Sequence, residues 1–448
     1  MTQEDPSPRF DPALPHHQRP KLRRTRVFPA DFKGQKMMGI SDARQVTDRM
    51  VFAPPAAQGL LPLLNGERTI QQIADEFGQG LGVDNLQHLV VQLDQAGLLE
   101  GPTFELMLAR MHADFDATDN LPPAATAAFT ESLGVELSKN GADEGRPPLE
   151  PGQVLKDALD DYISRTLAND PNPPLEDLPR GIIVPHLDYP RGWVAYATIW
   201  GRMRGLPRPD RVVILGTNHF GVGTGITICD KGYATDLGVC PVDATLLAAL
   251  QKRLGPENAA KSLKNRYDHE REHSIELQVP WVQACIGPDA QGHHVPVLGI
   301  LVHDPTVNQG ESYDGKGLGL DPFVEALSAA IKDVGGRTLV VSSADLSHVG
   351  PMFGDEVPLA GEAPEVMEFR NRVSGHDRQL LSLVAANKPD DLFAAMAWQQ
   401  NPTRWCSVGN IIAGMKVVRP VRVDVYRYAV ALDPQGMSLV TCVGAVMR

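Results

Sequence analysis

Residues 338–349 read TLVVSSADLSHV, a β-rich run that leads directly into a segment carrying Asp345 and His348. Two other runs have the same form, namely GIIVPHLDY (181–189), which carries His186, and RVVILGTNH (211–219), which ends at His219. Short apolar runs followed by turn-forming residues are typical of buried strands. In α/β sheets ligands bind in the crevice beyond the carboxyl ends of the strands, so we expect these histidines to converge there.

Strand-like runs of this kind alternate with helical patterns from residue 151 to the end of the chain. Several of the runs are apolar on both faces, as expected of a sheet that helices cover on each side. The last two, residues 421–432 and 438–447, are expected to be antiparallel strands at one edge. We therefore predict that residues 151–448 form an α/β domain with a mixed sheet flanked by helices on both faces.

The beginning of the chain has a different composition. Residues 1–35 are rich in Pro, His and Arg and include the basic run RPKLRRTR (19–26). Such a segment is expected to be a flexible, solvated leader. Residues 106–150 mix short helical pieces with Pro and Gly, so we expect them to form a connecting segment on the larger domain.

Between these two segments, residues 36–105 contain three amphipathic stretches, broken at Asn65-Gly66 and around residues 78–82. Apolar residues at spacings of three and four predict helices. A long helix followed by the apolar residues 96–99 is typical of a winged-helix module whose chain then enters a β-wing. Residues 85–95 contain no Lys or Arg, which favours a docking role over DNA binding.

Charge and hydropathy restrict the partners. The chain has 448 residues and a formal net charge of -13, whereas nucleic-acid binding depends on clustered Lys and Arg. No apolar stretch reaches the roughly 18–20 residues that cross a bilayer, and no signal-peptide core is present. We expect a cytoplasmic protein with neither a nucleic-acid nor a membrane partner. The five cysteines lack CxxC spacing and are expected to be free thiols.

The segment HEREH (269–273) is a formal match to H-E-x-x-H, the helical zinc motif of metalloproteases. A zinc hydrolase is the less favoured alternative, because no third ligand follows at a suitable distance and Pro280 ends the helix early. We expect instead that His273 and Glu276, one helical turn apart, point into the crevice to support ligands or bind substrate. His269 is expected to be partly exposed.

Five separated segments, PHLDY, GTNH, EHSIELQVPW, SSADLSH and RWCSVGNI, together resemble the Memo family in the same order, including the bacterial form called AmmeMemoRadiSam system protein B. The resemblance covers roughly residues 175–448. It implies a fold similar to that of class III extradiol dioxygenases of the LigB type. Residues 36–105 resemble the small peptide-recognising modules related to PqqD.

The resemblance implies a mononuclear non-haem metal site with His186, His219 and Cys406 as ligands. Two imidazoles and a thiolate favour Fe(II), with Cu and Zn as alternatives. His348 matches the family histidine that serves as acid and base in extradiol enzymes, and Asp345 would orient it or a ligand.

Neighbouring residues of the same segments, Asp188, Tyr189 and Asn218, are expected to line the pocket or support the ligands. PHLDY differs from the PHAGY common in the family, so Asp188 could bind metal, pair with Arg191 or change the substrate. The usual Cys-Gly is also replaced here by Cys406-Ser407.

Two functions remain open at this stage. One is a metal-dependent oxidoreductase, dioxygenase-like, acting on a small-molecule or peptide substrate. The other is a non-catalytic metal-binding accessory protein whose front domain docks a radical-SAM partner. A fold and a metal triad do not by themselves decide between them.

Overall fold

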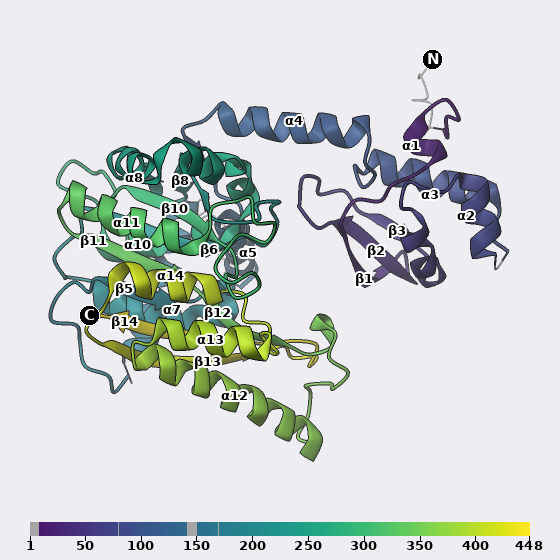
Figure 1. The fold of residues 1–448 in the computed structure, drawn as a ribbon. Helices are drawn as coiled ribbons and strands as arrows, with labels where there is room; N and C mark the ends of the chain where they lie inside the picture. The colour runs from purple at the N-terminus through teal and green to yellow at the C-terminus, as the bar shows by residue number, and fades with distance from the viewer. Residues whose placement is uncertain (1–8, 79, 141–149, 169) are drawn as a thin grey trace. The chain divides into compact units, whose positions relative to one another are not determined.

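The computed structural model describes residues 9–78, 80–140, 150–168 and 170–448. The chain divides into two compact units, Met1–Thr118 and Asp119–Arg448. Each unit has its own core of buried apolar side chains. Figure 1 labels most of the helices and strands of both units.

The smaller unit begins with a short helix, continues with three strands and ends with further helices. Its elements are α1 (Pro15–Gln18), β1 (Thr25–Phe32), β2 (Gln35–Asp42), β3 (Val51–Ala53), the 3-10 helix η1 (Pro55–Leu63), α2 (Ile70–Phe77), α3 (Val83–Gln95) and α4 (Pro102–Asp116). The strands pair antiparallel in the order β1-β2-β3. Ile40, Ile73 and Leu86 are fully buried in the core that joins this sheet to α2 and α3.

The flexible leader expected over residues 1–35 is wrong for the part that the structure describes, because α1 and β1 lie there. The basic run is not simply solvated either. Arg23 is only 8% exposed, and its guanidinium donates to both carboxylate oxygens of Asp42 at 3.1 and 3.2 Å and to the Gly97 carbonyl at 2.6 Å. The partners of Arg23 are distant in sequence, so the composition of the run gave no sign of them.

The three helical stretches expected in residues 36–105 are present as η1, α2 and α3. The β-wing expected after residues 96–99 is wrong: Leu99 forms a single bridge with Leu22, and α4 begins at Pro102. The strands of this unit are supplied instead by the residues that precede the helices. The likeness to PqqD-related modules stays a prediction.

The larger unit takes up part of the expected connecting segment and the whole of the expected α/β domain. Its helices are α5 (Ala125–Asn140), α6 (Pro151–Leu167), α7 (Tyr189–Met203), α8 (Ala244–Leu263), η2 (Arg266–Arg271), α9 (His273–Glu276), α10 (Val279–Ile286), α11 (Leu320–Val334), η3 (Pro351–Phe353), α12 (Pro364–Ala385), α13 (Pro389–Gln399) and α14 (Val408–Val418). Its strands are β4 (Asn120–Leu121), β5 (Gly181–Val184), β6 (Arg211–Thr217), β7 (Thr227–Ile228), β8 (Gly232–Thr235), β9 (Gly238–Cys240), β10 (Val297–Val302), β11 (Thr338–Ser343), β12 (Asp345–Val349), β13 (Val423–Leu432) and β14 (Leu439–Met447).

One mixed eight-stranded sheet organises this unit. Its strand order is β12-β14-β5-β11-β6-β10-β7, with β13 paired to β14. The four strands β5, β11, β6 and β10 are parallel, and β14, β13 and β12 are antiparallel beside them. The expected antiparallel strands at one edge are therefore confirmed. Strands β4, β8 and β9 form a separate small sheet.

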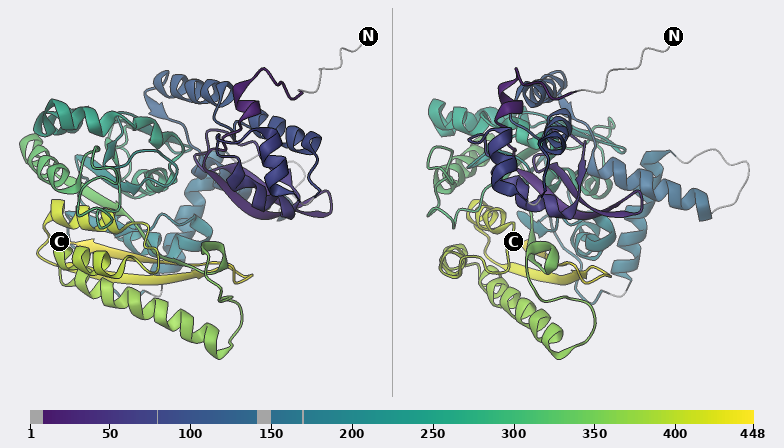
Figure 2. Two further views of the ribbon diagram at one scale, coloured as in Figure 1. Left: turned by 45° about the vertical axis from the view of Figure 1, so that its right-hand side comes forward. Right: turned by 90° about the vertical axis from the view of Figure 1, so that its right-hand side faces the viewer.

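Helices cover both faces of the large sheet. Val443 of β14 belongs to the same core cluster as Ile411 of α14. The next residue, Gly444, faces the other way, since a Cβ atom there would lie 2.9 Å from Ile199 of α7. Successive strand residues point to opposite faces, so α7 and α14 lie on opposite sides of the sheet. In the turned views of Figure 2, α12 (green) runs beside the yellow C-terminal strands.

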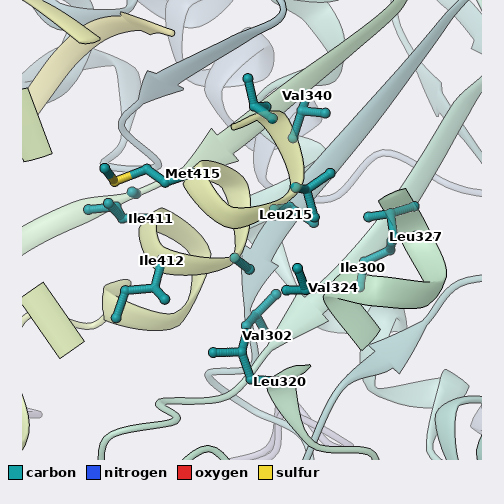
Figure 3. Packing of buried hydrophobic residues seen from close by; sticks show 14 of the residues in the cluster. Leu215, Ile300, Val302, Leu320, Val324, Leu327, Val340, Ile411, Ile412 and Met415 are labelled. Carbon is teal, nitrogen blue, oxygen red and sulfur yellow. The ribbon is translucent and has the colours of Figure 1, made fainter. Parts of the chain in front are cut away.

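The main core lies between the parallel strands and helices α11 and α14. Figure 3 shows the side chains that interlock there, namely Leu215, Ile300, Val302, Leu320, Val324, Leu327, Val340, Ile411, Ile412 and Met415. Each such side chain stabilises the fold by roughly 1.5–3 kcal/mol on burial. This packing holds the parallel strands rigidly, and with them the loops at their carboxyl ends. Within the described residues, the structure contains no helix with the length and apolar character needed to span a bilayer.

Candidate metal centre

The carboxyl ends of three parallel strands bring the strand-end histidines together. His186 lies two residues beyond β5 and His219 two residues beyond β6, while Asp345 and His348 lie on β12, immediately after β11. Cys406 comes from the turn just before α14. These residues are far apart in the sequence, but they lie close together in space because the strands that precede them are neighbours in the sheet.

His186, His219 and Cys406 form a compact triad. Their potential ligand atoms all lie within 4.8 Å of one another. The Cys406 Sγ atom is 3.3 Å from His186 Nε2, and the two imidazole rings have centroids 5.0 Å apart. His186 is buried, at 2% exposure, whereas His219 and Cys406 are half-buried. The triad therefore has an inner and an accessible side.

Hydrogen bonds fix the orientation of both imidazoles. His186 Nδ1 donates to the Ser343 carbonyl at 3.0 Å, and His219 Nδ1 donates to Glu272 Oε1, also at 3.0 Å. A neutral imidazole that donates through Nδ1 presents a lone pair at Nε2. In their neutral forms both histidines are thus held in the tautomer that a metal ligand needs, by the kind of supporting hydrogen bond that metal-binding histidines make.

Glu272 is a residue of the candidate site that sequence reasoning missed. Its Oε2 atom accepts the His219 backbone N–H at 2.7 Å, and its Oε1 atom lies 3.3 Å from His273 Nδ1. Burial alone would raise the pKa of Glu272, but His219 and His273 hold it far below its usual range. The carboxylate is therefore ionised and orients two rings. The one sign of this role in the sequence is that a carboxylate, Glu272, directly precedes His273 in the segment EHSIE.

Electrostatics favour the thiolate of Cys406. Burial alone would raise the pKa of this thiol, but His186 and His219 lower it to about 6. Burial also opposes the charged form of His219, yet Glu272 and Cys406 raise the pKa of His219 well above its ordinary value. The Ser407 hydroxyl lies 3.1 Å from Cys406 Sγ, so this side chain contacts the thiol.

Asp345 borders the triad, with its Oδ2 atom 3.7 Å from His186 Nε2, and His348 lies three residues further along β12. Asp345 Oδ1 accepts the backbone N–H groups of His186 at 3.1 Å and Leu187 at 3.2 Å, which holds the loop after β5. Burial raises the pKa of the Asp345 carboxyl to about 6, although His348 opposes this shift. His348 Nδ1 is 2.9 Å from the Leu346 carbonyl, which leaves Nε2 as the lone-pair atom. Burial lowers the pKa of His348, so its neutral form is favoured.

His273 lies beside the triad, with its ring centroid 5.6 Å from that of His186 and 4.9 Å from that of His219. Glu276 has a different position. Its carboxylate accepts hydrogen bonds from the backbone N–H groups of residues 124–126 at 2.8 to 3.1 Å and from the Thr126 hydroxyl at 2.6 Å, at the start of α5. The structure thus brings His273, but not Glu276, to the metal-ligand candidates.

The remaining pocket candidates make local structural contacts. Asp188 caps α7 by accepting from Arg191 N at 3.2 Å, and its carboxylate pairs with the Arg191 guanidinium. Tyr189 is fully buried and donates to the Leu277 carbonyl at 2.7 Å. Asn218 donates to Asp268 at 2.8 Å and shapes the loop that carries His219. Of the three expectations for Asp188, the structure contains the ion pair.

HEREH does not form one helix. Residues 266–271 are the 3-10 helix η2, Glu272 is extended with φ -86° and ψ 117°, and α9 starts at His273. The expectation that His269 is partly exposed is wrong: it is 2% exposed and hydrogen-bonded through both ring nitrogens, to Tyr233 OH and the Thr227 carbonyl, each at 3.1 Å. Burial lowers the pKa of His269 to about 4. The backbone break at Glu272 separates the two histidines that the motif would need together.

Fold and site define an α/β protein with a His-His-Cys candidate metal centre at the carboxyl edge of a mixed sheet. A family model described as Memo-like protein matches residues 153–445. The chain therefore belongs to the Memo family.

Curated relatives, each named a MEMO1 family protein, agree with this assignment. Those from Desulfurococcus amylolyticus, Sulfolobus acidocaldarius and Aquifex aeolicus are 27%, 28% and 24% identical to this chain. The matches cover 46%, 51% and 82% of this chain and 66%, 70% and 82% of the respective relatives. For the relatives from Desulfurococcus amylolyticus, Pyrobaculum arsenaticum and Pyrobaculum aerophilum, the chain spans only 66%, 57% and 54% of their length.

Proposed function

We propose that the Asp119–Arg448 unit is a metalloprotein that holds one transition-metal ion on His186, His219 and Cys406. The observation that supports this most directly is the convergence of three ligand atoms within 4.8 Å, with both Nδ1 atoms engaged by other acceptors. Two Nε2 lone pairs and a thiol of lowered pKa fit a metal ion chemically.

The donor set favours some metals over others. A thiolate beside two imidazoles suits Fe(II), Cu and Zn and does not suit Mg or Ca. We favour Fe(II), with Cu or Zn as outcomes of the test below. When bound, Fe or Cu would supply redox chemistry with O₂ or with an oxidisable small-molecule or peptide substrate, whereas Zn would act only as a Lewis acid.

The protein's own contribution to a reaction is proton transfer and positioning. His348 is the proton acceptor of this proposal, because burial favours its neutral form and its Nδ1 atom is already engaged by Leu346. Asp345 positions His186 through the backbone of the loop. O₂ consumption by the iron-loaded protein that is unchanged in His348→Ala would contradict this role.

A second candidate is an accessory protein that carries iron for a radical-SAM partner. The observation that favours it is the separate N-terminal unit, whose edge strand β1 exposes Val27, Phe28 and Phe32 at 40%, 37% and 38%. Tight metal binding without turnover, and co-purification of a radical-SAM protein that is lost on deleting residues 1–110, would support this role.

The test of the metal site is metal content by mass spectrometry. Wild type, His186→Ala and Cys406→Ala are purified anaerobically beside His269→Gln, a matched buried histidine outside the triad. Near-stoichiometric Fe, Cu or Zn in wild type and His269→Gln, lost in the two triad variants, is the expected result. Equal metal in all four proteins would overturn the ligand set.

A further inference from the structure

A buried carboxylate lies behind the candidate metal centre. Asp377, on α12, has 0% exposure and accepts four side-chain hydrogen bonds. Its Oδ1 atom accepts from Ser347 Oγ at 2.5 Å and from Trp405 Nε1 at 2.7 Å. Its Oδ2 atom accepts from the Tyr428 hydroxyl at 2.7 Å and from Thr441 Oγ1 at 2.6 Å.

Asp377 is a buried carboxylate whose hydrogen-bond donors are all neutral. No Lys or Arg of the described chain lies within ion-pair distance of Asp377, so neutral donors satisfy the carboxylate. Burying a charge without an opposite charge is costly, and hydrogen bonds to a charged acceptor are about twice as strong as neutral ones. The four donors are therefore held tightly, and their spacing is set by the geometry of one rigid carboxylate.

Two of the donors are direct chain neighbours of the site residues. Ser347 precedes His348 on β12, and Trp405 precedes Cys406 in the turn before α14. Both bind the same Oδ1 atom, and Trp405 Nε1 also lies 3.2 Å from Ser347 Oγ. Asp377 Oδ1 thus joins the segment that contains the candidate ligand Cys406 to the segment that contains the candidate base His348.

Backbone contacts join the same two segments elsewhere. His348 N donates to the Thr403 carbonyl at 2.8 Å, and Arg404 Nε donates to the His348 carbonyl at 2.8 Å. These bonds fix how the segments run past each other. The Asp377 bonds tie the side chains of Ser347 and Trp405 to the same buried oxygen atom.

We propose that Asp377 is a positioning residue that sets the placement of Cys406 relative to His348. This inference rests on the proposed metal-binding function. Trp405 connects Asp377 to the neighbouring Cys406, and Ser347 connects Asp377 to the neighbouring His348.

The test uses full-length protein loaded with Co(II), whose thiolate charge-transfer absorption reports the cobalt–sulfur bond. We expect Asp377→Asn and Trp405→Phe to alter the position or intensity of this band and to weaken Co(II) binding by on the order of tenfold. Tyr428→Phe is the matched control, because it removes one bond to the same carboxylate and leaves the bonds from Ser347, Trp405 and Thr441 in place. It should leave the band unchanged.

A second control separates positioning from general destabilisation. Asp243 is a buried carboxylate beside the first residues of β6 and β10, where it pairs with Arg211 Nε at 2.8 Å and caps α8 through Leu246 N at 2.8 Å. Asp243→Asn should lower the melting temperature while leaving the cobalt band unchanged. If Asp377→Asn fails to fold, Trp405→Phe alone decides the outcome.

The outcomes are distinguishable. A wild-type band that persists unchanged in Asp377→Asn and Trp405→Phe overturns the positioning role and leaves the metal site intact. No thiolate band in the wild type overturns the proposed metal site and the positioning role with it. Ser347→Ala should leave the cobalt band in place and shift the pH profile of O₂ consumption by the iron-loaded protein.

Discussion

Glu272 holds His219 at two points: Oε2 accepts the backbone N–H at 2.7 Å and Oε1 accepts the ring Nδ1–H at 3.0 Å. One buried carboxylate therefore fixes the position of the residue, the rotation of its ring and its tautomer. Such carboxylates affect metal affinity although they do not touch the metal.

Replacing this carboxylate tests that relationship. We expect Glu272→Gln to weaken metal binding by roughly 10- to 100-fold, because the amide retains the shape but loses the charge that holds Nδ1–H. Competition with a chelator measures the change. Glu276→Gln is the matched control, since Glu276 is also buried and serves α5. It should lower the melting temperature and leave metal affinity unchanged; equal weakening in both variants would contradict the role of Glu272.

The α/β architecture could be predicted from sequence because buried parallel strands are short apolar runs whose ends are marked by polar residues. His186 and His219 were predictable for the same reason, since each directly follows such a run. Cys406 could not be derived from residue patterns and was expected only through the family resemblance. Glu272 and Asp377 were missed because their roles depend on partners from distant segments, which one sequence does not display.

The lowered pKa of Cys406, about 6, predicts its reactivity in the metal-free protein. Thiolates are the nucleophilic form, so alkylation by iodoacetamide should be near maximal above pH 7 and fall as the pH drops through about 6. Cys229 and Cys285 are the internal controls, because burial raises the pKa of each to about 12. Peptide mass spectrometry after timed alkylation identifies the reacting thiol.

The same shift has a consequence for stability with a definite sign. The folded-state pKa of Cys406 lies below the ordinary value of 9.0, so its ionisation favours the folded state. That contribution is full above pH 9 and is lost as the pH falls from 9 through 6. Cys406→Ser should therefore flatten the pH dependence of metal-free stability in this window. An identical slope in both proteins, measured by urea unfolding, would contradict the lowered pKa.

The structure assigns Asp188 the role of a helix cap rather than that of a metal ligand, and the two roles predict different effects of mutation. The side chain is 48% exposed and accepts from Arg191 N at the start of α7. We expect Asp188→Ala to cost about 0.5–2 kcal/mol in the free energy of unfolding, because a cap is lost, and to leave metal content unchanged. Asp188→Asn retains the cap and should be nearly neutral. Loss of metal in Asp188→Ala would contradict this prediction and indicate that Asp188 is a metal ligand.

HEREH shows how a local pattern misleads when the backbone does not follow the expected helix. H-E-x-x-H requires two histidines one turn apart on the same helix face. Here the extended conformation at Glu272 directs His269 into the core and leaves His273 beside the triad. Sequence spacing alone does not reveal this break, because the residues around it are compatible with a helix.

His269 provides the corresponding experiment. Its ring nitrogens bond Tyr233 OH and the Thr227 carbonyl, and burial lowers its pKa to about 4, so it is a neutral core residue. We expect His269→Ala to destabilise the fold by roughly 2–4 kcal/mol, since it leaves a cavity and unpaired polar groups. Metal content per folded molecule should equal that of wild type, and Glu270→Gln should likewise retain it. If His269→Ala instead lost metal while the free energy of unfolding stayed the same, His269 would be a metal ligand and the zinc motif would be supported. Removing a ligand lowers metal affinity without requiring a change in the packing of the core.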